Sequence, residues 1–168
     1  MSDGSNGQTD AGALPQDGPP PDISIQPIGQ YVKDLSFENP GAPLNLTARP
    51  QIELGVDLQA KRLDAERFEV ELKLRVSAQA ENKPVFLLEL VYGGLFQVNG
   101  NPPEDFLQQV LLIDAPNLLF PFARRIVADA VRDGGMPPLM IEPINFAALY
   151  RAKTAEGQIR AGSPTQAA

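Results

Sequence analysis

The chain has 168 residues, of which 43% are hydrophobic, and it carries a formal net charge of −7 with no histidine and no cysteine. This length is enough for one domain with a hydrophobic core, and the negative charge opposes binding to a nucleic acid backbone. Without cysteine, the chain cannot form a disulfide framework, a thiol nucleophile or a thiolate metal site.

The first 22 residues are the least hydrophobic part of the chain. Met1 and Leu14 are their only large apolar side chains. Such a segment cannot bury enough surface to offset chain entropy, so residues 1–22 are predicted to be a disordered tail. The N-terminus lacks the basic segment and apolar core of a signal peptide, and no apolar run approaches the roughly 20 residues that span a bilayer. A cytoplasmic location without membrane insertion is therefore expected.

Between residues 34 and 98 apolar and polar side chains alternate in four runs. This pattern predicts four strands, each with one apolar face and one polar, solvent-exposed face. The runs cover residues 34–38, 52–59, 68–77 and 85–98. The fourth run is the most apolar, which indicates a central strand, and Gly93-Gly94 within it suggests a bulge or bend. Short polar connections at 61–65 and 80–83 predict hairpins and hence an antiparallel sheet.

After Pro102-Pro103 the apolar spacing becomes helical. The pattern predicts a first helix over 106–111 and a second from about Leu118 to Asp133, with Asn117 as the N-cap. Gly134-Gly135 and Pro137-Pro138 then stop the second helix, and a short third helix is expected over 145–151.

Four strands followed by helices predict an α+β fold, in which C-terminal helices pack on one face of a four-stranded antiparallel sheet. Residues 23–152 are the predicted domain. Residues 153–168, rich in small and polar side chains, are predicted to be a flexible C-terminal tail.

Catalytic motifs are missing from the sequence. No histidine is available as a general base, and no GxSxG, GxGxxG or P-loop pattern is present. Glu69 and Glu71 alternate with apolar residues on a strand, a pattern typical of a solvated face. We therefore expect no enzyme, no cofactor and no metal site. An acid–base enzyme that uses these two carboxylates is the last of the alternatives.

The predicted second helix carries more apolar side chains than one buried stripe can hold. Its apolar residues include Leu118, Leu119, Phe120, Phe122, Ile126, Val127 and Val131. The surplus is expected to meet another subunit or an apolar ligand.

Four segments, in order along the chain, resemble the bacterial export chaperone family SecB. They are YVKDLSFE with Asn39-Pro40 and Ala42-Pro43 after it, FLLEL running into GGLF, PNLLFPFAR, and GMPPL followed by PINFAALY. The resemblance implies a homotetramer, built as a dimer of dimers, that binds unfolded preproteins without ATP. It also implies delivery of these preproteins to SecA, the motor of the Sec translocon.

The resemblance also implies two binding surfaces. The family's acidic docking surface for SecA, which receives a small basic zinc-bearing tail of that partner, matches Asp34, Glu38, Leu87 and Glu89. By position, the client groove would include residues that could equally be core or subunit contacts, namely Leu112, Ile113, Pro116, Leu118, Val127 and Val131. The alternatives are a SecB-like chaperone for another client, such as an antitoxin, and a protein that binds a small apolar ligand.

Overall fold

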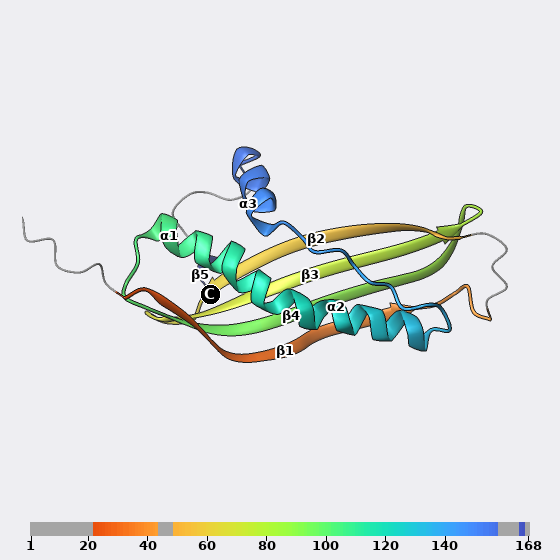
Figure 1. Ribbon diagram of the computed structural model, residues 1–168, viewed down its shortest axis with the longest axis horizontal. Helices are drawn as coiled ribbons and strands as arrows, with labels where there is room; N and C mark the ends of the chain where they lie inside the picture. The colour runs from red at the N-terminus through yellow and green to blue at the C-terminus, as the bar shows by residue number, and fades with distance from the viewer. Residues whose placement is uncertain (1–21, 44–48, 158–164, 167–168) are drawn as a thin grey trace, which may run out of the picture.

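One sheet with the strand order β1-β4-β3-β2-β5 forms the framework of the protein (Figure 1). The computed structural model describes residues 22–43, 49–157 and 165–166. The strands are β1 Ser24–Glu38, β2 Gln51–Arg62, β3 Arg67–Ala80, β4 Lys83–Asn99 and β5 Thr165–Gln166. The four long strands pair antiparallel, and the two-residue β5 lies parallel to the end of β2. The predicted α+β class and the antiparallel sheet of four strands are confirmed.

β4 lies between β1 and β3, as its apolar sequence predicted. The irregularities of this pairing, however, lie in β1 and not at Gly93-Gly94. The register of β1 shifts at Ile28 and at Lys33, while Gly93 and Gly94 pair regularly with residues of β1. Gly93 has a different role, because the ring of Tyr31 lies directly over it and a Cβ there would come within 2.5 Å of that ring.

The helices form one continuous run followed by a separate short helix. The elements are α1 Glu104–Gln109, the π-helical turn η1 Val110–Asp114, α2 Ala115–Asp133 and α3 Phe146–Ala155. The prediction of two separate helices, with Asn117 as an N-cap, is therefore wrong. Pro116 explains the π turn, because its ring would collide with a carbonyl one turn earlier in a regular α-helix and the wider turn relieves that clash.

The helical run crosses one face of the sheet from the β2 side to the β1 side (Figure 1). It packs onto alternate side chains of β3 and β4, which are fully buried and provide the core. The largest of these side chains are Phe68, Leu72, Leu74, Leu88, Leu90 and Phe96. Within the described residues, no helix has both the length and the hydrophobicity needed to cross a membrane. In the part of the chain that the structure describes, this helical run leaves the opposite side of the sheet uncovered, and we call that side the open face.

The C-terminal part of the chain is more ordered than the sequence suggested. α3 begins at its N-cap Asn145, whose side chain accepts a hydrogen bond from the Ala148 amide at 2.9 Å, and it ends at Ala155. The predicted start of the C-terminal tail at Lys153 thus falls inside the helix. The reason is that the Lys153 ammonium binds the Asp57 carboxylate of β2. Residues 158–164 and 167–168 of the predicted tail, and residues 1–21 of the N-terminal tail, lie outside the described residues.

On the open face, a nearly buried carboxylate ties three strands together. Glu71 of β3 is only 5% exposed, and its side chain contacts Lys33 of β1 at 2.6 Å and Lys61 of β2 at 3.2 Å. Burial would raise the pKa of Glu71, but hydrogen bonds and charge from both lysines outweigh it and lower the pKa to about 2. Hydrogen bonds to Glu71 and Glu69 raise the pKa of the Lys33 ammonium. This ion cluster therefore connects β1 to β2 across the width of the sheet.

The second carboxylate of this cluster, Glu69, binds the edge strand as well. Its side chain contacts the Lys33 ammonium at 2.9 Å and accepts a hydrogen bond from the Tyr31 hydroxyl at 2.5 Å. Burial, followed by this hydrogen bond, raises the pKa of Tyr31 to about 12. Tyr31 can reach β3 only because Gly93 lets its ring lie flat over β4. Glu69 and Glu71, predicted to be a solvated face, instead hold the open face together.

We predict that Glu71→Gln lowers the free energy of unfolding by about 2 kcal/mol at neutral pH, because Lys33, Lys61 and Lys73 all lose an ion-pair contact. Folding lowers the pKa of Glu71 from 4.5 to about 2, so the unfolded chain binds this proton more readily. The stabilisation should be complete above pH 4.5 and should disappear as the pH falls towards 2. Denaturant unfolding of both proteins between these pH values measures the difference, and a difference that does not change with pH would contradict the assignment.

We also predict that Gly93→Ala destabilises the protein by about 1–3 kcal/mol, because the added methyl group displaces the Tyr31 ring from Glu69. In a Tyr31→Ala background the same change should cost much less, as a double-mutant cycle by thermal unfolding would show. Gly29→Ala is the matched control, since a Cβ there meets nothing within 4 Å. Equal effects at the two glycines would rule out this role for Gly93.

Candidate functional site

The register of the four long strands places the polar side chains of the open face in rows. One row runs across the sheet through Asp34, Val91, Lys73 and Asp57. The next contains Ser36, Glu89, Arg75 and Gly55, and the third contains Glu38, Leu87, Ser77 and Glu53. Alternate residues of a strand share a face, so all three rows lie on the side of the sheet opposite the run of α1, η1 and α2.

The structure brings together the four residues assigned to the acidic surface. Asp34 and Glu38 lie on β1, Leu87 and Glu89 lie on the adjacent β4, and Glu38 pairs directly with Leu87. Side chains on paired residues of neighbouring strands lie about 5 Å apart, and rows are separated by about 7 Å. We refer to these four residues as the acidic cluster. Together they form a small, flat surface with one apolar side chain among three carboxylates.

Two further carboxylates of β2 extend this surface, and sequence reasoning missed both. Glu53 lies at the end of the row of Glu38 and Leu87, and Asp57 lies at the end of the row of Asp34. Their alternation with apolar residues of β2 predicted the correct face. Only the register, however, shows that they share rows with the acidic cluster.

The carboxylates of this face differ in whether the chain itself provides a counterion. Within the described residues, no hydrogen bond or ion pair joins the side chains of Asp34, Glu38 or Glu53 to another group. Glu89, in contrast, pairs with Arg75. Asp57 pairs with Lys153, and although burial would raise its pKa, this partner holds the pKa below the ordinary value.

A hollow of about 410 Å³ lies in the open face where Gly55 has no side chain. It is lined by Asp34, Gly55, Val56, Asp57, Lys73, Leu74, Arg75, Glu89, Leu90 and Val91. The hollow therefore adjoins the acidic cluster and shares two of its residues.

The other side of the molecule exposes apolar side chains. Leu118 and Phe122, one turn apart on α2, are 42% and 47% exposed, and Ile52 and Leu54 of β2 are 40% and 41% exposed. The helical run crosses the sheet diagonally and does not cover the first half of β2 (Figure 1). Of these four residues, only Leu118 was among the candidate client residues, and Phe122 was assigned only to the apolar surplus of the second helix. The alternation in β2 does not reveal how far a helix covers that strand.

The six candidate client residues separate into two groups. Leu112, Pro116, Val127 and Val131 are buried within the chain, where they contribute to the core between the helices and the sheet. Ile113 is half-buried, and Leu118 is exposed. Only the last two are accessible to another molecule in this structure.

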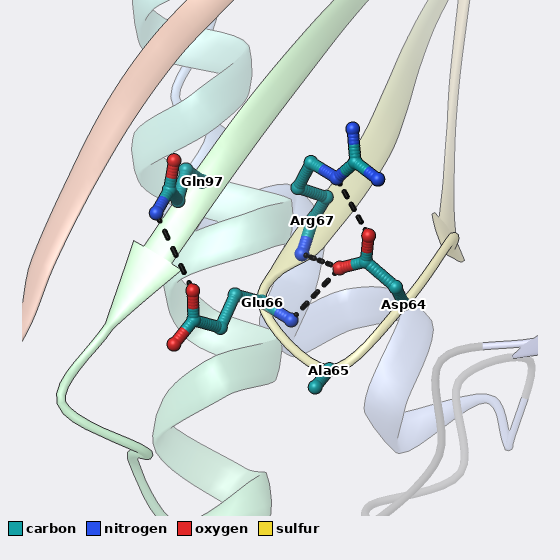
Figure 2. Close-up of a pocket in the computed structure, with 5 residues that line it drawn as sticks. All are labelled: Asp64, Ala65, Glu66, Arg67 and Gln97. Atoms are coloured by element: carbon teal, nitrogen blue, oxygen red, sulfur yellow. Dashed lines mark hydrogen bonds and ion pairs between the residues drawn. The ribbon is translucent and has the colours of Figure 1, made fainter.

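A second hollow lies at the hairpin between β2 and β3, but its polar groups bind one another (Figure 2). The Asp64 carboxylate accepts hydrogen bonds from the Glu66 and Arg67 amides at 3.0 and 2.8 Å and from the Arg67 side chain at 2.6 Å. The Gln97 amide donates to Glu66 at 3.4 Å. These contacts close the turn and do not indicate a ligand. In the part of the chain that the structure describes, no group of three acidic side chains could hold a metal ion.

Comparisons with known proteins agree with this architecture. The family model described as preprotein translocase subunit SecB matches residues 17–157. The chain is 52% identical over 141 residues to the protein-export protein SecB of Sinorhizobium fredii, which covers 82% of this chain and 84% of that protein. It is 49% identical over 152 residues to the protein-export protein SecB of Parvibaculum lavamentivorans, with 89% and 88% coverage.

One solved structure has the same fold. It is a SecB-like chaperone of Mycobacterium tuberculosis in complex with a peptide of an antitoxin. The TM-score is 0.62 at 18% identity, and the match covers 71% of this chain and 90% of that chain. At this identity the likeness concerns the fold alone.

The burial of the candidate client residues predicts different costs for shortening them. Val127→Ala should lower the free energy of unfolding by about 2 kcal/mol, because it leaves a cavity under the helix. Leu118→Ala removes a larger but exposed side chain and should cost less than about 0.5 kcal/mol. Denaturant unfolding of the two variants measures both values. A large cost at Leu118 would mean that another copy of the chain covers it.

Proposed function

The chain belongs to the SecB family, and from this membership we propose that it is an ATP-independent chaperone that holds secretory preproteins unfolded and delivers them to SecA. The observation that supports this proposal is the division of the sheet into two unlike sides. One side exposes apolar residues next to the helices, and the other exposes the acidic cluster. A carrier needs two such surfaces, one for its client and one for the recipient.

The apolar side suits an unfolded client. Leu118, Phe122, Ile52 and Leu54 each expose an apolar side chain on this side. Burial there contributes only about 25 cal/mol per Å² and requires no particular client sequence. A folded protein has already buried its own apolar segments, so it gains little by binding. Weak contacts of this kind can hold a long chain and also release it without hydrolysis of a nucleotide.

Assembly would make this weak binding effective. We infer a homotetramer, built as a dimer of dimers, in which one unfolded preprotein contacts several copies. Linked contacts raise the overall affinity by orders of magnitude over that of one copy. The same assembly would cover part of the apolar surface that a single chain leaves exposed.

The acidic cluster suits the basic zinc-bearing tail of SecA. Asp34 and Glu38 provide carboxylates without a partner among the described residues, and Leu87, which pairs with Glu38, adds an apolar contact. Complementary charge accelerates encounter and selects the partner. Any zinc in this contact belongs to SecA. We infer that the chaperone works in the cytoplasm, where preproteins meet SecA, and that it performs no chemical step.

The test is the refolding of a denatured, slow-folding secretory precursor without ATP. The protein should arrest refolding at a stoichiometric amount of tetramer, and SecA should relieve the arrest. Arrest without relief would indicate a chaperone for another client, such as an antitoxin. If refolding continues at a high excess of the protein, the proposed chaperone function is rejected. The exposed apolar surface would then be assigned to contacts between subunits.

Two double variants separate the surfaces. Asp34→Asn with Glu89→Gln should weaken SecA binding about tenfold and leave the arrest intact, because two interface charges are lost. Leu118→Glu with Phe122→Glu should weaken the arrest and leave SecA binding intact. Asp105→Asn with Glu142→Gln removes two exposed charges outside the acidic cluster and serves as the control for net charge. Loss of both activities in either of the first two variants would contradict separate surfaces.

A further inference from the structure

The ion pair between Arg75 and Glu89 lies inside the surface that would receive SecA. We propose that Arg75 is an internal competitor for Glu89, so that a basic side chain of SecA must displace it and the affinity of docking is set by this exchange. The inference rests on the proposed docking of SecA at the acidic cluster. It assigns to this chain a specificity-determining residue that lies outside that cluster.

The first argument is the position of the pair. Arg75 of β3 and Glu89 of β4 face each other directly in the register, and the Arg75 guanidinium contacts the Glu89 carboxylate. The side chains are 64% and 44% exposed. An ion pair in such contact with water is weak and exchanges readily, unlike a buried one. A cation from a partner can therefore replace Arg75 at a small cost.

The second argument is the charge around the acidic cluster. Lys73, the nearest other cation in the same strand, is engaged elsewhere, because its ammonium contacts Gln59 at 3.2 Å and Glu71 at 3.7 Å. Arg75 is thus the cation that an incoming basic side chain meets at Glu89. Until Arg75 moves, it occupies the Glu89 carboxylate that the incoming side chain would bind.

The third argument is that a displaced Arg75 has somewhere to go. Gly55 is its direct neighbour on β2, and the hollow of about 410 Å³ opens where a side chain would otherwise stand. Glu53 and Asp57 lie two residues to either side of Gly55 on the same face. Diagonal neighbours of this kind lie within reach of a long side chain. Arg75 can therefore leave Glu89 without leaving the vicinity of carboxylates.

The test compares Arg75→Gln with Arg67→Gln in binding to the zinc-bearing tail of SecA, measured by calorimetry at low and high salt. Arg67 lies on the same strand and face, is 58% exposed, and pairs with the carboxylate of Asp64. Eight residues of strand place it about 26 Å from Arg75, well beyond the screening length of about 10 Å. Both variants remove one positive charge, so only the position differs.

Arg75→Gln should bind the tail about two- to fivefold more tightly than the wild type, and the gain should decrease at high salt. Arg67→Gln should bind as the wild type does. In a Glu89→Gln background, Arg75→Gln should bring no gain, because the competition needs the carboxylate.

The other outcomes overturn the inference in distinguishable ways. If the wild type fails to bind the tail, both the proposed docking of SecA and the proposed competition by Arg75 are rejected. If the wild type binds but Arg75→Gln behaves like Arg67→Gln, the proposed docking of SecA is retained and the proposed competition by Arg75 is rejected. Weaker binding of Arg75→Gln would show that Arg75 contacts SecA itself. A gain that persists without Glu89 would mean a general effect of net charge.

Discussion

The packing of one helical run on the apolar face of β3 and β4 is the interaction on which the rest of the structure depends. It buries the large side chains of both central strands, and it therefore dictates which face of the sheet remains in water. Since side chains alternate, every charged residue of β3 then lies on the open face. The two unlike sides of the protein are thus consequences of a single packing choice.

The open face contains ion pairs of two kinds, and their burial separates their roles. Glu71 is almost fully buried among lysines, so loss of a partner would leave a charge without compensation, and the cluster is fit to hold strands in place. Glu89 and Arg75 are both well exposed to water, at 44% and 64%, and such a pair contributes little to stability. The first kind gives a rigid platform, and the second gives a contact that a partner can exchange.

Sequence patterns predicted most of the fold because they are local. Alternation along 52–58 and 68–76 determined both the strands and their apolar faces, and the polar connections determined the antiparallel order. The predictions were wrong where contacts between distant parts of the chain override local sequence preferences. Asn117 has the chemistry of an N-cap, but the helix passes through it because a π turn accommodates Pro116. The composition of residues 153–168 predicted a tail that begins at Lys153. In the structure Lys153 lies in α3 and binds Asp57 of the distant strand β2.

The sequence by itself determined the class of fold, the family and the residues of the acidic cluster, because each depends on side-chain order along the chain. It could not determine which carboxylates have counterions, since Arg75 and Glu89 meet only through the register of β3 with β4. Nor could it show that Val127 is core and Leu118 is surface, although both are apolar residues of one helix. That distinction arises from how the helix is rotated against the sheet, and rotation is decided only when the two surfaces pack together.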